Sequence, residues 1–130
     1  MTRVPGSASP ASATGPVGRS RTLWLVALGV AIVVQLITLY SPQVPGTPPI
    51  AGFDKVVHLA IFAAPVLAAL LAGLSAPWVL GILAVHAPVS ELVQHVALSG
   101  RSGDVFDMMA DLCGVALGAL VYLVWIRRNA

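Results

Sequence analysis

Residues 104–126 read DVFDMMADLCGVALGALVYLVWI, and this stretch decides the fold. It is long enough to cross a bilayer, because a spanning helix needs about 20 mostly apolar residues. Acidic and small residues recur along it at intervals of three, four, three and four, which places them in one stripe down a helix. The stripe consists of Asp104, Asp107, Asp111, Gly114 and Gly118. The sequence therefore predicts a membrane-spanning helix with one polar, closely packed face.

Three apolar segments of similar length precede this one, so that the four together cover residues 22–40, 56–74, 77–98 and 105–126. The chain has 58% hydrophobic and 9% charged residues and a mean hydropathy of +0.92, whereas soluble domains contain about 25% charged residues. We therefore predict an all-α protein, a four-transmembrane-helix bundle over residues 22–126. Residues 1–21, rich in Pro, Ser, Ala and Gly, are predicted to be a disordered cytoplasmic tail.

The charges are sorted along the chain, and this sorting predicts the orientation. The two ends carry five arginines with no acidic residue near them: Arg3, Arg19, Arg21, Arg127 and Arg128. Because cytoplasmic segments carry an excess of basic residues, both termini are predicted to be cytoplasmic, with residues 41–55 and 99–104 outside. Trp24, Trp78 and Trp125 would then all lie at the inner edge of the membrane, an interface at which tryptophan is enriched.

Polar residues gather in the predicted outer half of the membrane. Glu91, Gln94 and His95 are three and four residues apart, so they share one helix face, and Asp54 and His58 are also four apart. These spacings predict an outward-open polar network that consists of Asp54, Lys55, His58, Glu91, Gln94, Arg101, Asp104, Asp107 and Asp111. An unpaired charge at this depth is costly, so we expect Arg101 to pair with Glu91, Asp104 or Asp107.

Several of these residues also have a purely structural interpretation. Asp54 and Asp104 stand where the N-cap of a helix would stand. Gly114 and Gly118 form a Gly-x-x-x-Gly pair, which lets a neighbouring helix approach closely. We therefore predict helix packing for the glycines, and either capping or a functional site for the two acids.

Four further residues are interpreted from their place within apolar segments. Pro65 and Pro88 each remove a backbone hydrogen bond, which predicts kinks. His86 is interpreted as a packed histidine without chemistry. Cys113 is the only cysteine, which excludes a disulfide framework, and it is interpreted as a small buried packing residue.

The residue types in the network suit a divalent cation, since imidazole and carboxylate groups are common metal ligands. The candidates are His58, Glu91, His95 and the three aspartates of the last segment. Their spacing matches no H-E-x-x-H or paired Cys/His motif, and the chain has no Gly-rich phosphate loop or serine elbow. The sequence therefore predicts no catalytic residue and no cofactor, and it leaves a metal site open. Nucleic acid is not an expected partner, because no basic stripe interleaved with aromatic residues is present.

The same residues carry a family resemblance. Asp54-Lys55-Val56-Val57-His58 resembles the Asp-Lys-x-x-His that opens a helix in the VanZ-like family of small bacterial integral membrane proteins. Glu91-Leu92-Val93-Gln94, Gly100-Arg101 and the acids Asp104, Asp107 and Asp111 resemble the second motif of that family. The resemblance covers residues 53–120. The chain departs at Ser99, where the family commonly has proline, and at Asp111, where it commonly has asparagine.

The resemblance implies a cell-envelope role for a multi-pass protein of the bacterial cytoplasmic membrane, because the family is named for a protein linked to glycopeptide (teicoplanin) resistance. Our leading hypothesis is that the polar network binds a lipid-linked or amphiphilic ligand, such as a cell-wall precursor or a lipoglycopeptide. One alternative is a membrane enzyme acting on a lipid headgroup, with Glu91 or Asp107 as base and a metal held by carboxylates and His58 or His95. Another is a small proton-coupled carrier. The lipid bilayer is the expected environment, and four short helices leave a homo-oligomer open.

Overall fold

The computed structural model describes residues 16–41, 52–98 and 104–129. These residues form four helices: α1 (Pro16–Tyr40), α2 (Phe53–Leu71), α3 (Ala76–Ala97) and α4 (Val105–Asn129). All four are long and apolar enough to cross a membrane. The prediction of an all-α protein with four membrane-length helices is confirmed.

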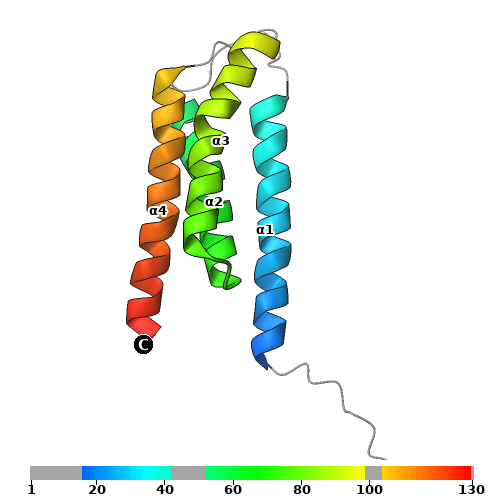
Figure 1. The fold of residues 1–130 in the computed structure, drawn as a ribbon, viewed down its shortest axis with the longest axis vertical. Helices are drawn as coiled ribbons and strands as arrows, with labels where there is room; N and C mark the ends of the chain where they lie inside the picture. Colours follow the sequence, from blue (N-terminus) through cyan, green and yellow to red (C-terminus); the bar gives the residue numbers. More distant parts are fainter. Residues whose placement is uncertain (1–15, 42–51, 99–103, 130) are drawn as a thin grey trace, which may run out of the picture.

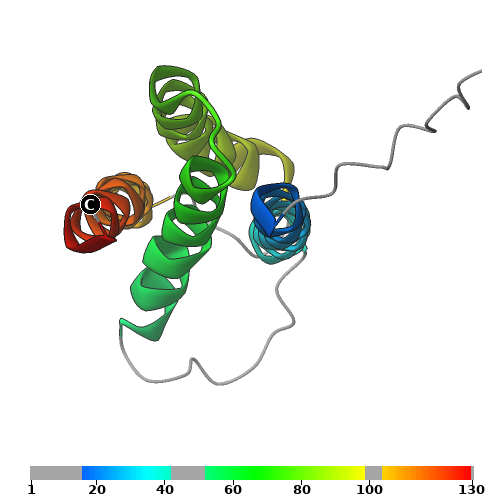
Figure 2. The same cartoon turned by 90° about the horizontal axis from the view of Figure 1, so that it is seen from below.

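The helices run alternately up and down, with α2 between the other three (Figures 1 and 2). The first turns of α1 and the last turns of α4 lie at the same end of the bundle (Figure 1). The opposite end holds the start of α2, the end of α3 and the start of α4, and we call it the polar end. Because α2 and α4 both start there, these two helices run parallel.

Several helix boundaries differ from the predicted segments: α1 begins six residues early, α2 begins and ends three residues early, α3 is displaced by one residue and α4 ends three residues late. α1 begins at Pro16, so residues 16–21 belong to the helix and not to the predicted disordered tail. Proline suits the first helical position, where its missing N–H leaves no hydrogen bond unmade. α2 ends three residues early, at Leu71, because Gly73 adopts φ +79° and closes the helix in a Schellman motif. The Leu74 N–H donates to the Ala69 carbonyl, and the Gly73 N–H donates to that of Leu70, both at 3.0 Å.

One of the two predicted acidic caps is confirmed. The Oδ1 of Asp104 accepts a hydrogen bond from the Phe106 N–H at 2.9 Å, at the start of α4. Asp54 is not a cap, because α2 begins at Phe53 with Gly52 before it and Asp54 lies inside the first turn. The Asp54 carboxylate is therefore free to take part in side-chain pairing at the polar end.

Pro65 lies inside α2 and Pro88 inside α3, as predicted. The later, yellow part of α3 leans from its earlier, green part toward α1 (Figures 1 and 2). A proline within a helix is a sufficient cause for such a bend. The bend brings the end of α3 to the end of α1, where the Gln94 Nε2 donates to the Leu39 carbonyl at 3.1 Å.

The closest helix packing joins α2 to α4, and two glycines make it possible. A Cβ atom at Gly114 would collide with the Leu59 carbonyl oxygen, and one at Gly118 would lie 2.6 Å from the Ala63 carbonyl oxygen. Both glycines therefore pack directly against α2. Cys113, by contrast, is exposed and not buried as predicted. It lies 200° around the helix from Asp111, at about 100° per residue, and so points away from the packed stripe.

Candidate functional site

The polar end brings together seven side chains from three helices. α2 contributes three of them, α3 one and α4 two, and the seventh precedes α4 directly. We call this set the polar cluster; it consists of Asp54, Lys55, His58, Glu91, Asp104, Asp107 and Asp111. It contains all five acidic residues of the chain and its only lysine. Arg101, which is predicted to belong here, lies outside the described residues.

The outer part of the cluster is organised around Lys55. Its Nζ lies 3.0 Å from Asp107 Oδ1, 3.2 Å from Asp54 Oδ2 and 3.5 Å from Asp104 Oδ2. Lys55 thus holds two of the acids for which Arg101 is the expected partner. The sequence contains a signal that Lys55 belongs to this cluster. Lys55 precedes His58 by three residues, so the two side chains lie on the same face of α2.

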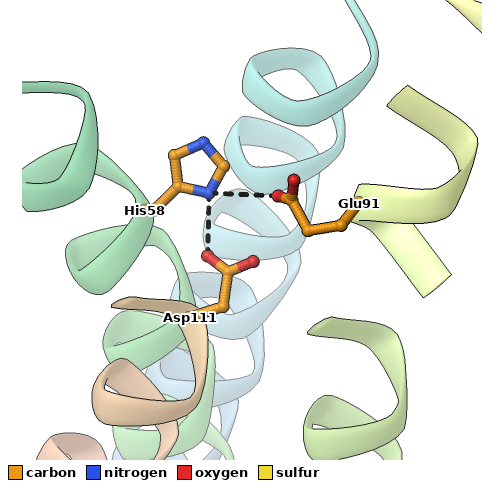
Figure 3. A group of neighbouring side chains, drawn as sticks. All are labelled: His58, Glu91 and Asp111. Carbon is orange, nitrogen blue, oxygen red and sulfur yellow. Dashed lines mark hydrogen bonds and ion pairs between the residues drawn. The ribbon is translucent and has the colours of Figure 1, made fainter. Parts of the chain in front are cut away.

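The inner part joins α2, α3 and α4 through one histidine (Figure 3). The Nδ1 of His58 lies 2.9 Å from Asp111 Oδ1, which is hydrogen-bond distance, and 3.8 Å from Glu91 Oε1. All three residues are buried. A histidine and two carboxylates therefore meet inside the bundle, beneath the outer acids of the polar end.

Glu91 also connects the inner part to the chain before α4. Its Oε2 accepts a hydrogen bond from the Asp104 backbone N–H at 2.9 Å. Its other oxygen, Oε1, and the Oδ2 of Asp111 are buried and have no hydrogen-bond partner among the described residues. Buried polar atoms nearly always have a partner, so these two oxygens call for a physical explanation.

The cluster leads from the surface into the bundle. The exposed fraction of the side chain falls from 54% for Asp54 to 14% for Asp107 and 0% for Asp111. Five carboxylates face one lysine and one histidine along this path, so the described cluster is acidic. An acidic path with a low-dielectric wall concentrates cations at its mouth.

Two residues that the sequence placed in or beside the network, Gln94 and His95, have other surroundings. Gln94 faces α1 through its bond to Leu39, so it packs beside the cluster. His95 is exposed, which contradicts the prediction that it shares the face of Glu91 and Gln94. Its position is 100° beyond that of Gln94, at about 100° per residue, enough to turn it out of the bundle.

His86 is interpreted from the sequence as a packed residue without chemistry. Its Nε2 lies 3.0 Å from the Tyr40 hydroxyl, and its ring packs against that of Phe62 with ring centres 5.5 Å apart. The bond to Tyr40 joins the end of α1 to the middle of α3. This agrees with a structural role, although no sequence spacing points to Tyr40 as the partner.

Among the described residues, one group has the composition and spacing to hold a metal ion. His58, Glu91 and Asp111 each offer one ligand atom, and these atoms all lie within 4.8 Å of one another. The cluster as a whole offers carboxylates for binding a cationic group and a buried imidazole for proton transfer or metal coordination. Comparison of the chain with protein-family models, with curated proteins and with solved structures finds no match.

Proposed function

We propose that the protein is a VanZ-like cell-envelope protein of the bacterial cytoplasmic membrane whose polar cluster faces outward and binds an amphiphilic ligand with a cationic headgroup. The observation that carries the proposal is the gathering of all five carboxylates of the chain at one end of the bundle, around Lys55 and His58. Charge at membrane depth is costly and is kept for binding or transport more often than for stability alone. The proposed role includes resistance to a lipoglycopeptide such as teicoplanin.

The outward orientation is supported by the residues at the opposite end of the bundle. Arg127 and Arg128 lie in the last turn of α4, at the same end as the first turns of α1 (Figure 1). Basic residues beside membrane spans favour the cytoplasmic side. Trp78, in the first turn of α3, and Trp125, near the end of α4, are both exposed at this end, where a tryptophan ring would meet the membrane interface. The polar end then opens to the outside.

The charge of the cluster favours one class of headgroup. An ammonium group can replace water around the outer carboxylates, Asp54 and Asp104, with charge-assisted hydrogen bonds. A phosphate would meet carboxylates of the same sign, so a lipoglycopeptide with a free amine suits the described cluster better than a phosphate-linked cell-wall precursor. Large exposed apolar side chains lie close to the cluster in the chain, at Val96, Val105 and Phe106. They would contact the acyl chain of the ligand within the outer leaflet.

The test uses a host that lacks the gene. The wild-type gene should change susceptibility to a lipoglycopeptide, whereas Glu91→Gln and Asp107→Asn should not. Both changes remove charge and keep size. The purified variants should bind a fluorescent lipoglycopeptide at least about 10-fold more weakly, because a hydrogen bond to a charged group contributes about 1.5–3 kcal/mol.

The matched control is His95→Gln, which changes an exposed titratable residue one turn from Glu91. It should behave as the wild type in both assays. If Glu91→Gln and Asp107→Asn are expressed at normal levels and confer the full change in susceptibility, the cluster has a structural role only and the proposal is wrong.

A further inference from the structure

We infer that His58, Glu91 and Asp111 form a binding site for one divalent transition-metal ion, with Zn²⁺ as the best fit. The site lies at the inner end of the polar cluster, between α2, α3 and α4 (Figure 3). It shares Glu91 with the polar cluster proposed above to bind the amphiphile, whereas the carboxylates proposed to meet the ammonium group, Asp54 and Asp104, lie outside the metal site.

Two carboxylate oxygens of this group lack a hydrogen-bond partner within the part of the chain that the structure describes. Glu91 Oε1 and Asp111 Oδ2 are buried without a hydrogen-bond partner among the described residues. Their side chains are 9% and 0% exposed. Oxygens of carboxylates are strong acceptors, and burial of such an atom without a donor or a cation is costly. A metal ion among the three residues would supply the missing partner of Glu91 Oε1 directly, and a rotation of the Asp111 carboxylate about its last torsion would bring Oδ2 to the ion as well.

The three residues also carry an unbalanced negative charge. Two carboxylates meet one imidazole here, and the Lys55 ammonium group pairs instead with Asp54, Asp104 and Asp107. A protonated His58 would balance only one of the two inner carboxylates. A divalent cation beside a neutral imidazole balances both, and a bound ion is the largest local charge in such a site. The buried group would then carry no net charge within the membrane.

The distances from His58 to the two carboxylates are close to those between ligand atoms around a metal ion. Tetrahedral coordination with bonds of about 2.0–2.2 Å places neighbouring ligand atoms about 3.3–3.6 Å apart. The His58 Nδ1 lies 2.9 Å from Asp111 Oδ1 and 3.8 Å from Glu91 Oε1, so the two separations fall on either side of this value. Adjustments of about half an ångström, within the reach of a change in side-chain torsion, would bring these two to it. The third separation, between the carboxylate oxygens of Glu91 and Asp111, is within 4.8 Å and would have to shorten on binding if it is near that limit.

The donor set selects the kind of metal. Ca²⁺ takes six to eight oxygen ligands and Mg²⁺ prefers octahedral oxygen coordination, whereas Zn²⁺ accepts one imidazole with two carboxylates in a four-coordinate site. Three protein ligands leave the fourth position for water. The Asp104 N–H that binds Glu91 Oε2 at 2.9 Å would orient this ligand from outside the first coordination sphere. The acidic path from Asp54 inward would provide access for a cation.

The test is a zinc titration of the full chain, carried out without any amphiphile, so its result does not depend on the proposed function. Metal-free protein with a histidine-free tag is reconstituted in nanodiscs and dialysed against Zn²⁺, and bound zinc is measured by elemental analysis. We expect one Zn²⁺ per chain. His58→Ala, Glu91→Gln and Asp111→Asn should each weaken binding at least about 10-fold, since even outer-shell partners of a metal site contribute 10–100-fold.

His95→Ala is the matched control and should bind zinc as the wild type does, because His95 is exposed. The absence of stoichiometric zinc in the wild type would overturn the inference. So would zinc binding that all three variants retain, or that His95→Ala loses equally.

A second measurement covers the case in which a variant fails to fold. Co²⁺ bound to the wild type in four-coordinate geometry should absorb strongly in the visible range, and one equivalent of Zn²⁺ should abolish this absorption. A weak spectrum, typical of six-coordinate Co²⁺ on surface groups, would count against the site.

Discussion

The close contact between α2 and α4 leads to a specific expectation for Gly118→Ala. The new Cβ would lie 2.6 Å from the Ala63 carbonyl oxygen and 2.8 Å from the Val66 Cβ, whereas ordinary contacts begin at 3.4 Å. The oxygen belongs to the backbone, so a side-chain rotation cannot relieve the clash. The two helices would have to separate by 0.8 Å at this point, the difference between 3.4 Å and 2.6 Å.

The expected loss of stability in Gly118→Ala follows from the cost of overpacking. An extra methyl group forced into a filled contact costs about 1–3 kcal/mol, while replacing glycine by alanine within a helix contributes up to about 1 kcal/mol in the opposite direction. Gly29 and Gly81 lie inside α1 and α3, and a Cβ added at either would meet no neighbouring side chain or helix within 4 Å. Alanine at either control site has the same helix propensity and no clash. We therefore expect Gly118→Ala to be about 1–3 kcal/mol less stable than Gly81→Ala.

The assay is reversible unfolding of the purified protein in mixed micelles by a denaturing detergent, followed by circular dichroism. The four single variants Gly29→Ala, Gly81→Ala, Gly114→Ala and Gly118→Ala are compared with the wild type. The two changes in α4 should lower the free energy of unfolding relative to the two controls. Equal stability of Gly118→Ala and Gly81→Ala would refute the close α2–α4 contact.

Two further expectations concern the outer carboxylates and the topology. Lys55→Gln should lower the melting temperature more than Lys55→Arg, because it leaves Asp107 without its cation, and adding Asp107→Asn should recover part of the loss; strictly additive effects in the double variant would show that the two residues do not interact. For the topology, single cysteines are introduced in a Cys113→Ser background and labelled with a membrane-impermeant reagent. Thr47→Cys should be labelled from outside and Pro10→Cys only after permeabilisation, and the reverse pattern would contradict the outward polar end.

The fold could be predicted from the sequence because apolar segments of membrane-spanning length indicate helices, and the polar stretches between them indicate the loops. The ends of the helices were harder to place, since hydropathy does not report on backbone geometry. Gly73 was the available signal for the end of α2, because a glycine after an apolar segment is a common helix terminator. Pro16 was the corresponding signal for the start of α1.

The sequence predicts the residue types of the site, whereas the contact between Lys55 and Asp107 was not among its predictions. The stripe on α4 placed Asp107 and Asp111 on the packed face, where the structure has them. The cationic partner of each aspartate depends on how α2 is rotated about its axis and shifted along it relative to α4. A single sequence does not specify that placement. His95 shows the same limit on α3, where spacing alone assigned it to the face of Glu91 and the bundle leaves it exposed.

A constant register between α2 and α4 connects the site to the packing. Lys55 contacts Asp107 and His58 contacts Asp111, at separations of 52 and 53 residues. Farther down, the side chain of Phe62 approaches Gly114 and that of Val66 approaches Gly118, each at a separation of 52 residues. The polar cluster and the glycine contact are therefore successive parts of one seam between two parallel helices.

This continuity explains why a single stripe of α4 changes from acids to glycines along its length. The glycines hold the two helices at a separation at which short aspartate side chains reach Lys55 and His58. A larger residue at Gly114 would separate the helices one turn below Asp111. The 2.9 Å hydrogen bond between Asp111 and His58 would then be the first contact of the site to lengthen. The geometry of the buried group formed by His58, Glu91 and Asp111 thus depends on two glycines, Gly114 and Gly118, that take no direct part in it.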